Sequence, residues 1–257
     1  MNEKLNKKTK KRLDIRLVEN GLAPSRERAA ALILAGGVFV NGKRAAKAGA
    51  PVAGDSKIEL HTKDIPYVSR GGVKLEGALA SFQIDVTSLV GFDIGASTGG
   101  FTDCLLIHGA QKVYAIDVGY GQFSWKLRQD QRVQLFERKN IRFVTPEEFS
   151  EKGDIAVIDV SFISLKLVLP AVISLLKPGG ELLALIKPQF ELSRGDVGKG
   201  GVVKDPQKHQ IAISSVCEFT KEAGLKLTGV EESILPGPKG NREFFLYAKT
   251  GEPENPR

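Results

Sequence analysis

Residues 92–103 of this 257-residue chain limit its fold more than any other stretch, because they form a glycine-rich turn between two apolar segments. The short apolar run before the turn is typical of a buried strand, and residues 101–108 carry apolar side chains at helical spacing. Gly95, Gly99 and Gly100 lack a Cβ atom, so the backbone can turn tightly and a ligand can lie against it. The sequence therefore predicts the first half of a nucleotide-binding α/β unit.

The spacing of these glycines argues against two common phosphate-binding motifs. It does not fit G-x-G-x-x-G, and no lysine follows the glycines as in a P-loop. Asp93 stands just before the turn, and Asp117 ends the next apolar run. Carboxylates at these strand ends suit ribose hydroxyls and a cationic cofactor better than a pyrophosphate. We therefore predict S-adenosylmethionine as the cofactor, and a purely architectural turn is the alternative.

The predicted cofactor residues lie at three successive strand ends. Asp117 is expected to hold the ribose hydroxyls, and Asn140 or Ile141, after the third strand, the adenine. The residues expected around the methionine part come from the turn itself: Asp93, Gly95, Ser97, Thr98, Gly99 and Phe101.

Composition argues against several classes of protein. Cys104 and Cys217 lie far apart in apolar helical segments, and the three histidines are scattered. This predicts no disulfide framework, no metal site and a reducing, cytoplasmic location. The N-terminus is polar and basic, which is unlike a secretory signal. The longest apolar stretch, residues 165–176, is shorter than the ~20 residues of a membrane span, so no membrane partner is expected.

The positive charge is concentrated near the N-terminus. Residues 1–70 hold 15 Lys/Arg and 7 Asp/Glu, a balance of +8, whereas residues 71–257 hold 22 and 23, a balance of −1. A localised basic surface is the footprint expected of a nucleic-acid partner. A solubilising tail would explain the lysines of residues 4–11 but not the arginines that follow within folded-looking sequence.

The first 60 residues predict two short helices and a small β-ribbon. Residues 12–17, 25–29, 36–42 and 54–55 resemble the small RNA-binding module named after ribosomal protein S-four. We expect this domain over residues 1–60, with residues 1–11 as a flexible basic tail and residues 61–67 as a linker. The resemblance and the basic pattern give the expected RNA contacts, which would add affinity more than sequence choice: Arg12, Arg16, Ser25, Arg26, Arg28, Lys43 and Arg70.

Residues 68–250 are predicted to form a second domain, followed by a tail over residues 251–257. Apolar runs alternate with helical patterns, which is typical of a doubly wound, mostly parallel sheet with helices on both faces. Residues 225–235 and 243–249 have no helix between them and should pair as a hairpin. A parallel sheet that ends in an antiparallel hairpin resembles the seven-stranded, Rossmann-like fold of class I methyltransferases. The predicted strands lie at 92–95, 113–117, 133–136, 155–159 and 181–186.

Four charged residues are candidates for catalysis. Asp159 and Lys187 follow two of the predicted strands, Glu243 precedes the last strand, and Lys74 lies on the first helix of the domain. Ligands of such folds bind at the carboxyl ends of the strands, so these side chains should converge beside the turn. Singly, each would more often be a solvated charge. Together they resemble the Lys-Asp-Lys-Glu tetrad of the FtsJ-like ribose 2′-O-methyltransferases.

Longer motifs narrow this resemblance to the TlyA family, whose members are often labelled hemolysins. They are residues 67–75, 93–102, 159–165 and 187–191. The resemblance implies methylation of a cytidine ribose in ribosomal RNA, with ribosomal RNA or ribosomal subunits as the partner. The chain stops soon after its last strand, as in the short type of the family. The resemblance implies that this type modifies large-subunit (23S) RNA, and small-subunit (16S) RNA is the alternative second target.

The chemistry requires an aligned hydroxyl and an acceptor for its proton, for which Lys187 is the candidate. A free lysine has a pKa of about 10.4, which must fall toward about 7–8 for such a role. Lys74 would lower it, whereas Asp159 and Glu243 would oppose the change and position the amines. Residues 190–204, rich in glycine, are either a mobile loop over the RNA entrance or an ordinary exposed loop. The sequence leaves the oligomeric state open, and a monomer is compatible with it.

Two other classes of function compete with a methyltransferase. The hemolysin label suggests a cytolytic protein, but the sequence offers no amphipathic pore segment. A catalytically silent RNA-binding or ribosome-assembly factor would have no need of two lysines and two acids at strand ends.

Overall fold

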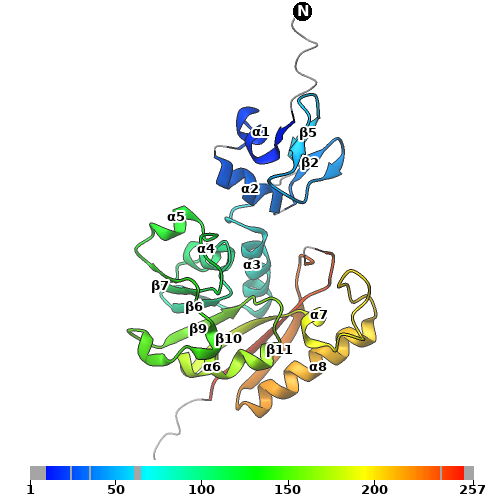
Figure 1. The fold of residues 1–257 in the computed structure, drawn as a ribbon. Helices are drawn as coiled ribbons and strands as arrows, with labels where there is room; N and C mark the ends of the chain where they lie inside the picture. The colour runs from blue at the N-terminus through cyan, green and yellow to red at the C-terminus, as the bar shows by residue number, and fades with distance from the viewer. Residues whose placement is uncertain (1–9, 24, 35, 61–64, 238, 252–257) are drawn as a thin grey trace, which may run out of the picture. The chain divides into compact units, whose positions relative to one another are not determined.

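The computed structural model describes residues 10–23, 25–34, 36–60, 65–237 and 239–251. The chain divides into two compact units, Met1–Arg70 and Gly71–Arg257, which are drawn in Figure 1. Most of the two expected tails, residues 1–9 and 252–257, and part of the expected linker, residues 61–64, lie outside the described residues.

The small unit contains the two helices and the β-ribbon that its sequence predicts. β2 pairs with both β3 and β5 in antiparallel fashion. The Asn41-Gly42 turn joins β2 to β3, and its φ angles of 50° and 74° are those of a tight hairpin turn. The elements are β1 Lys11–Arg12, α1 Leu13–Glu19, α2 Arg26–Leu34, β2 Val38–Val40, β3 Lys43–Arg44, β4 Pro51–Val52 and β5 Ile58–Leu60.

The expected tail over residues 1–11 is too long by at least one residue. Lys11 belongs to β1, where it pairs with Val52, and Arg12 pairs with Pro51. A polar two-residue strand leaves no signal in the sequence. It forms because the chain enters the domain beside β4, and the backbone N–H of Leu13 then donates to Ala50 O at 2.9 Å.

Helix and ribbon of the small unit share one apolar core. Leu13 and Leu17 from α1, Ile33 from α2 and Val38 from β2 are at most 1% exposed. These residues lie at the helical and strand spacings that the sequence predicts, so burial of one face of each element holds the unit together.

The large unit is built on a seven-stranded sheet in the order β11-β12-β10-β9-β6-β7-β8. The strands β10, β9, β6, β7 and β8 are parallel, and β12 runs antiparallel to both β10 and β11. This confirms the predicted fold class. The strands are β6 Val90–Ile94, β7 Lys112–Ile116, β8 Val133–Phe136, β9 Gly153–Ile158, β10 Leu176–Ile186, β11 Lys226–Glu232 and β12 Phe244–Lys249.

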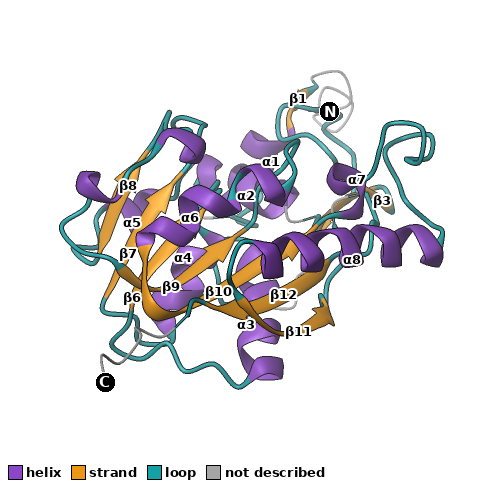
Figure 2. Cartoon of the chain, turned by 90° about the horizontal axis from the view of Figure 1, so that it is seen from below, coloured by secondary structure: helices purple, strands orange, loops and turns teal. Residues whose placement is uncertain are grey.

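Helices cover both faces of this sheet. Figures 1 and 2 show α3 and α4 on one face and α6 and α8 on the other. The core between the sheet and the second group contains Phe92, Tyr114 and Val172, all fully buried. The α-helices are α3 Arg70–Phe82, α4 Gly100–Ile107, α5 Trp125–Arg128, α6 Leu169–Leu175, α7 Pro188–Glu191 and α8 Pro206–Glu222, and the short 3-10 helices are η1 Ile141–Phe143, η2 Pro146–Glu148 and η3 Leu165–Leu167.

The predicted hairpin of the last two strands is present, but its order in the sheet matters for function. β12 lies between β10 and β11, so the last strand of the chain is adjacent to the parallel strand β10 and β11 forms the edge of the sheet. In this register Ile186 at the end of β10 faces Phe244 at the start of β12. The residues just beyond this pair, Lys187 and Glu243, are therefore neighbours at one edge of the sheet.

Candidate active site

The glycine-rich turn passes close to the end of β9, and this explains its composition. Gly95 has φ +85°, and a Cβ atom there would lie 2.5 Å from the backbone oxygen of Asp159. Gly99, the N-cap of α4, has φ +92°, and its Cβ atom would lie 2.5 Å from a methyl group of Leu127. Glycine is required at both positions for its conformation and for the space.

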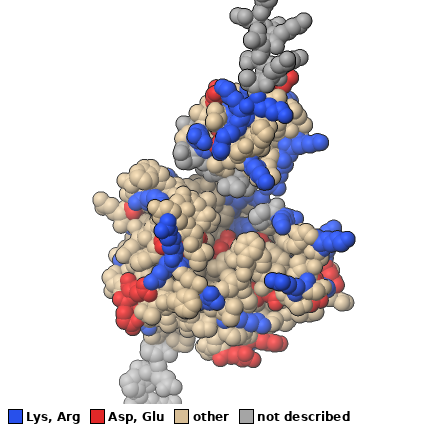
Figure 3. All heavy atoms as spheres, viewed as in Figure 1, with Lys and Arg blue, Asp and Glu red and all other residues tan. Residues whose placement is uncertain are grey.

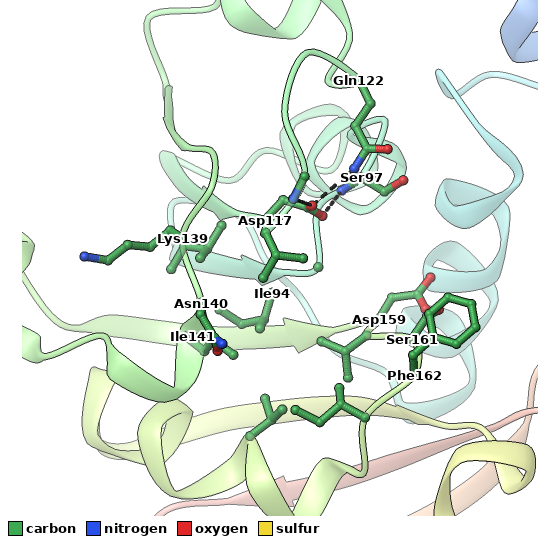
Figure 4. Close-up of a pocket in the computed structure, with 17 residues that line it drawn as sticks. Ile94, Ser97, Asp117, Gln122, Lys139, Asn140, Ile141, Asp159, Ser161 and Phe162 are labelled. Atoms are coloured by element: carbon green, nitrogen blue, oxygen red, sulfur yellow. Dashed lines mark hydrogen bonds between the residues drawn. The ribbon is translucent and has the colours of Figure 1, made fainter.

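The carboxylate of Asp117, at the end of β7, binds the outer part of the turn. It accepts hydrogen bonds from the backbone N–H groups of Ser97 (2.7 Å) and Gly119 (2.6 Å), and from the side-chain amide of Gln122 (3.1 Å). Figure 4 shows Asp117 beside Ser97 and Gln122, with the hydrogen bonds between the drawn residues as dashed lines. Because an ionised carboxylate has about four acceptor positions, Asp117 retains capacity for a ligand hydroxyl.

A cavity of about 460 Å³ opens at the carboxyl ends of the parallel strands (Figure 4). Its size is within the range of small-ligand sites. Asp117 and Gln122 supply polar groups on one side, and Asp159 lines it from the end of β9. The apolar part, which suits a planar base, is lined by Ile94, Ile116, Val118, Ile141, Val160, Ile163 and Val168.

Five of the predicted cofactor residues line this cavity: Gly95, Ser97, Asp117, Asn140 and Ile141. The side-chain oxygen of Asn140 accepts a hydrogen bond from the N–H of Arg142 and so caps η1. Thr98, Gly99 and Phe101 are not among the lining residues. Phe101 is 3% exposed and packs against Phe245, so its side chain belongs to the core.

Asp93 lies beneath the turn, fully buried at the end of β6. Its Oδ2 accepts hydrogen bonds from the N–H and the hydroxyl of Thr102, whereas its Oδ1 has no partner among the described residues. Burial raises the pKa of Asp93 to about 7, although the two bonds from Thr102 act in the opposite direction. Asp93 does not line the cavity, so its carboxyl group could act on a cationic ligand group there through its charge and not through contact.

The four candidate catalytic residues form two ion pairs. Lys187 Nζ lies 2.5 Å from Asp159 Oδ1 and donates a hydrogen bond to Ser161 Oγ at 3.0 Å. Lys74 Nζ, from α3, lies 2.5 Å from Glu243 Oε2. Both lysine side chains and that of Glu243 are at most 10% exposed.

The strand register brings these two pairs together. Ala184 of β10 faces Ile158 of β9, and Ile186 of β10 faces Phe244 of β12. Asp159, Lys187 and Glu243 therefore adjoin the same ends of three adjacent strands, and neighbouring strands lie about 4.8 Å apart. Since Asp159 also lines the cavity, the tetrad lies beside the place where a cofactor would bind.

Sequence reasoning missed several residues of the site. Ser161 contacts Lys187, and Gln122 and Lys139 line the cavity. Phe162 also lines it, with φ +65°, a 90% exposed side chain and its ring 5.1 Å from that of Phe190. Ser161 and Phe162 lie within the motif that follows Asp159, which could have indicated them, whereas Gln122 lies in a loop without a recognisable pattern.

The predicted RNA contacts of the small unit have varied surroundings. Arg12 and Arg26 both pair with the buried Asp14, and Arg16 donates to the backbone oxygen of Gly54 at 2.8 Å. Lys43 is exposed on β3. Ser25 precedes α2, Arg28 lies within α2 with a side chain outside the described part, and Arg70 begins α3. Figure 3 shows basic side chains over this unit.

Within the described residues, no cluster of His, Cys, Asp and Glu side chains is arranged to hold a metal ion. The two cysteines are free thiols. None of the described helices combines the length and the apolar character needed to cross a membrane.

The strand order, the antiparallel β12 and the cavity at the strand ends define the class of the large unit, a methyltransferase of the S-adenosylmethionine-dependent fold. Comparison with known families then gives the particular family. The FtsJ-like methyltransferase family matches residues 67–250, and the S4 domain matches residues 11–58. The chain belongs to the FtsJ-like methyltransferase family and carries an S4 domain before it.

Similar proteins span nearly the same length. One, from Bacillus subtilis, is 48% identical over 93% of this chain and 85% of its own, and is provisionally named rRNA methyltransferase YqxC. The 16S/23S rRNA (cytidine-2′-O)-methyltransferase TlyA of Mycobacterium tuberculosis is 46% identical over 93% of this chain and 90% of its own. A solved structure from Streptococcus thermophilus, provisionally titled a hemolysin, is 41% identical, has a TM-score of 0.75 and covers 96% of this chain and 92% of its own.

Proposed function

We propose that this protein transfers a methyl group from S-adenosylmethionine to the 2′-oxygen of a cytidine ribose in ribosomal RNA. Large-subunit RNA is the main target and small-subunit RNA the second candidate. The observation that carries the proposal is the presence of two ion pairs, Lys187 with Asp159 and the buried Lys74 with Glu243, at the strand ends beside the cavity. The relatives named for this reaction support the choice of substrate.

The cavity residues fit the proposed cofactor. Asp117 and the apolar residues near Ile141 would hold the adenosine, and the turn around Gly95 and Ser97 would approach the methionine part. Asp93, with its unpartnered oxygen, would attract the amino group. When bound, S-adenosylmethionine would supply a methyl group activated by the sulfonium charge.

Lys187 is the proposed group nearest the reacting hydroxyl. In the transfer, the ribose oxygen would form its bond to the methyl carbon while the bond between that carbon and sulfur breaks, so that the donor leaves as a neutral thioether. The hydroxyl proton would pass to the neutral amine form of Lys187 Nζ, and from there to solvent. Asp159 and Ser161 fix the position of Nζ from one side. Each lysine faces a carboxylate, so orientation is the better supported contribution, and it supplies up to about 7–11 kcal/mol in well-aligned systems.

Lys74 and Glu243 are the proposed second half of the site. Glu243 is 1% exposed and Lys74 is 7% exposed, so each offsets the cost of burying the other's charge. Together they would give the ribose and its phosphate a fixed charged surface next to Lys187. The S4 domain would supply RNA affinity, and a ribosomal substrate would place the protein in the cytoplasm.

The test is to incubate the protein with labelled S-adenosylmethionine and undermethylated ribosomal subunits, and to map the label. We expect it on a cytidine 2′-oxygen. Lys187→Ala should lower the rate at least 100-fold with little change in cofactor affinity. Lys177→Ala is the matched control. Lys177 also forms an ion pair, with Asp154 at 2.6 Å, but this pair lies at the opposite ends of the same two strands, β10 and β9. Label on a base, or none with the wild-type protein, would refute the proposed reaction.

A further inference from the structure

Glu191, the last residue of α7, connects the two loops that carry Lys187 and Asp159. Its Oε2 accepts a hydrogen bond from the hydroxyl of Ser164 at 2.6 Å, and its Oε1 accepts one from the N–H of Leu165 at 2.9 Å. Ser164 and Leu165 begin η3, at the far end of the loop that follows β9. Glu191 thus joins α7, which follows Lys187, to η3, which follows the loop after Asp159.

This connection complements the contacts at the near end of the same loop. There, Lys187 contacts Asp159 and Ser161. Between the two anchored ends lies Phe162, whose φ of +65° is rare for a residue with a side chain. A strained loop of this kind persists only where its surroundings fix it on several sides. Glu191 supplies the second fixed end.

The helix that carries Glu191 depends equally on this connection. α7 has only four residues, Pro188–Glu191, and a single helical turn is not stable by itself. Lys187 is its N-cap residue, so any displacement of α7 displaces Lys187. Glu191 is half-buried, and this burial raises the pKa of its carboxyl group. The cost of burying this charge is offset by the two hydrogen bonds to η3.

We infer that Glu191 is a positioning residue of the methyl-transfer site, holding Lys187 and Asp159 at their working separation by bridging α7 to η3. This inference rests on the proposed function, because that function gives the separation its catalytic meaning. The hydrogen bonds of the Glu191 side chain go to Ser164 and Leu165, so its effect on Lys187 and Asp159 is transmitted through the loop and α7.

Three variants test the inference. Glu191→Ala removes both hydrogen bonds. Glu191→Gln retains both, because the amide oxygen accepts from Leu165 and the amide N–H donates to the Ser164 hydroxyl. Asp154→Ala is the matched control, because Asp154 also joins two segments. It accepts a hydrogen bond from the N–H of Val90 at 2.9 Å and pairs with Lys177, but these contacts lie at the amino ends of the parallel strands, away from the candidate site.

In the methylation assay, we expect Glu191→Ala to lower kcat at least 10-fold with cofactor Kd and RNA KM changed less than twofold. Glu191→Gln should retain at least half of the wild-type kcat, and Asp154→Ala should change stability but not kcat. Hydrogen exchange supplies a readout independent of activity. Glu191→Ala should speed exchange over residues 159–166 and 187–192 alone.

The outcomes separate the inference from the reaction it serves. If the wild-type protein and Asp154→Ala transfer no methyl group, the proposed function fails, whatever the exchange data show. If they are active and Glu191→Ala matches them in kcat, the inference is wrong. It is also wrong if Glu191→Gln loses as much kcat as Glu191→Ala, because the bridge would then not be the cause.

Discussion

At the scale of a single residue, Gly95 brings the glycine-rich turn against the end of β9. Its absent Cβ atom would lie 2.5 Å from the backbone oxygen of Asp159, and backbone cannot move aside as a flexible side chain can. The glycine therefore permits the turn to approach the end of β9 closely, and both Gly95 and Asp159 line the cavity.

Gly95→Ala should lower stability by more than the ~1–2 kcal/mol that a left-handed residue costs, and should weaken S-adenosylmethionine binding. Gly179→Ala is the control, because Gly179 has φ +73° with nothing within 4 Å of its Cβ position. Gly179→Ala should lower the free energy of unfolding only by the ~1–2 kcal/mol that the left-handed backbone conformation costs. Urea unfolding and calorimetric titration measure the two effects, and equal losses in both variants would contradict the steric explanation.

Asp93 predicts a pH dependence of stability. Its pKa is about 7 in the folded protein and about 3.9 in an unfolded chain, so the folded state binds more protons between these values. Its contribution to stability is therefore full below about pH 4 and is lost as the pH rises through about 7, by at most about 1.4 kcal/mol per pH unit.

Urea unfolding between pH 4.5 and 8 should reveal this slope in the wild-type protein and a weaker one in Asp93→Asn. A cation bound beside Asp93 favours the ionised carboxyl group, so saturating S-adenosylmethionine should also flatten the slope. Parallel pH dependences in the two proteins would show that Asp93 does not titrate in this range.

At the scale of elements, the start of α8 is fixed by one side chain. Asp205 Oδ1 accepts a hydrogen bond from the N–H of Gln207 at 2.9 Å, and Pro206 occupies the first turn. Asp205→Ala should lower the free energy of unfolding by about 1 kcal/mol. Ser124→Ala is the control, because Ser124 is the N-cap of α5 without a side-chain capping bond. It should change stability by less than about 0.5 kcal/mol, and a larger loss there than at Asp205 would contradict the assignment.

Elements with a periodic pattern were predictable, and those without one were not. The strand at residues 133–136 has the predicted bounds, and the final hairpin forms as expected. Residues 165–176, the longest apolar stretch, do not form one element: they contain η3 and α6, and Leu176 already belongs to β10. An apolar run fits a buried helix and a buried strand alike, and only pairing with β9 decided the end of this one.

At the scale of the whole molecule, the basic small unit is proposed to bring RNA to the methyltransferase unit. Its predicted contacts are not equivalent, since Arg12 and Arg26 also hold the buried Asp14. The pKa of Asp14 is lowered to about 2, mainly by the hydrogen bond that it accepts from the Arg12 guanidinium. These arginines therefore serve the fold of the unit as well as any RNA contact.

Lys43 allows a cleaner test of RNA binding. Lys43→Ala should weaken binding of a ribosomal RNA fragment and reduce the slope of log K against log salt by about 0.7–0.9, the value for one phosphate contact. Lys57, which pairs with Glu59 at 2.6 Å in the same unit, is the matched control, and Lys57→Ala should leave the slope unchanged. An unchanged slope in Lys43→Ala would remove Lys43 from the RNA surface.

The sequence by itself determined the two domains, the alternation of strands and helices, the glycine-rich turn and the four charged residues, because each depends on local pattern or spacing. Only the tertiary structure decided how those residues pair. The insertion of β12 beside β10 puts Glu243 next to Lys187, and the close approach of Gly95 to Asp159 puts the tetrad beside the cavity. Such contacts join residues far apart in the chain, so sheet order and backbone packing decide them, and no local pattern records them.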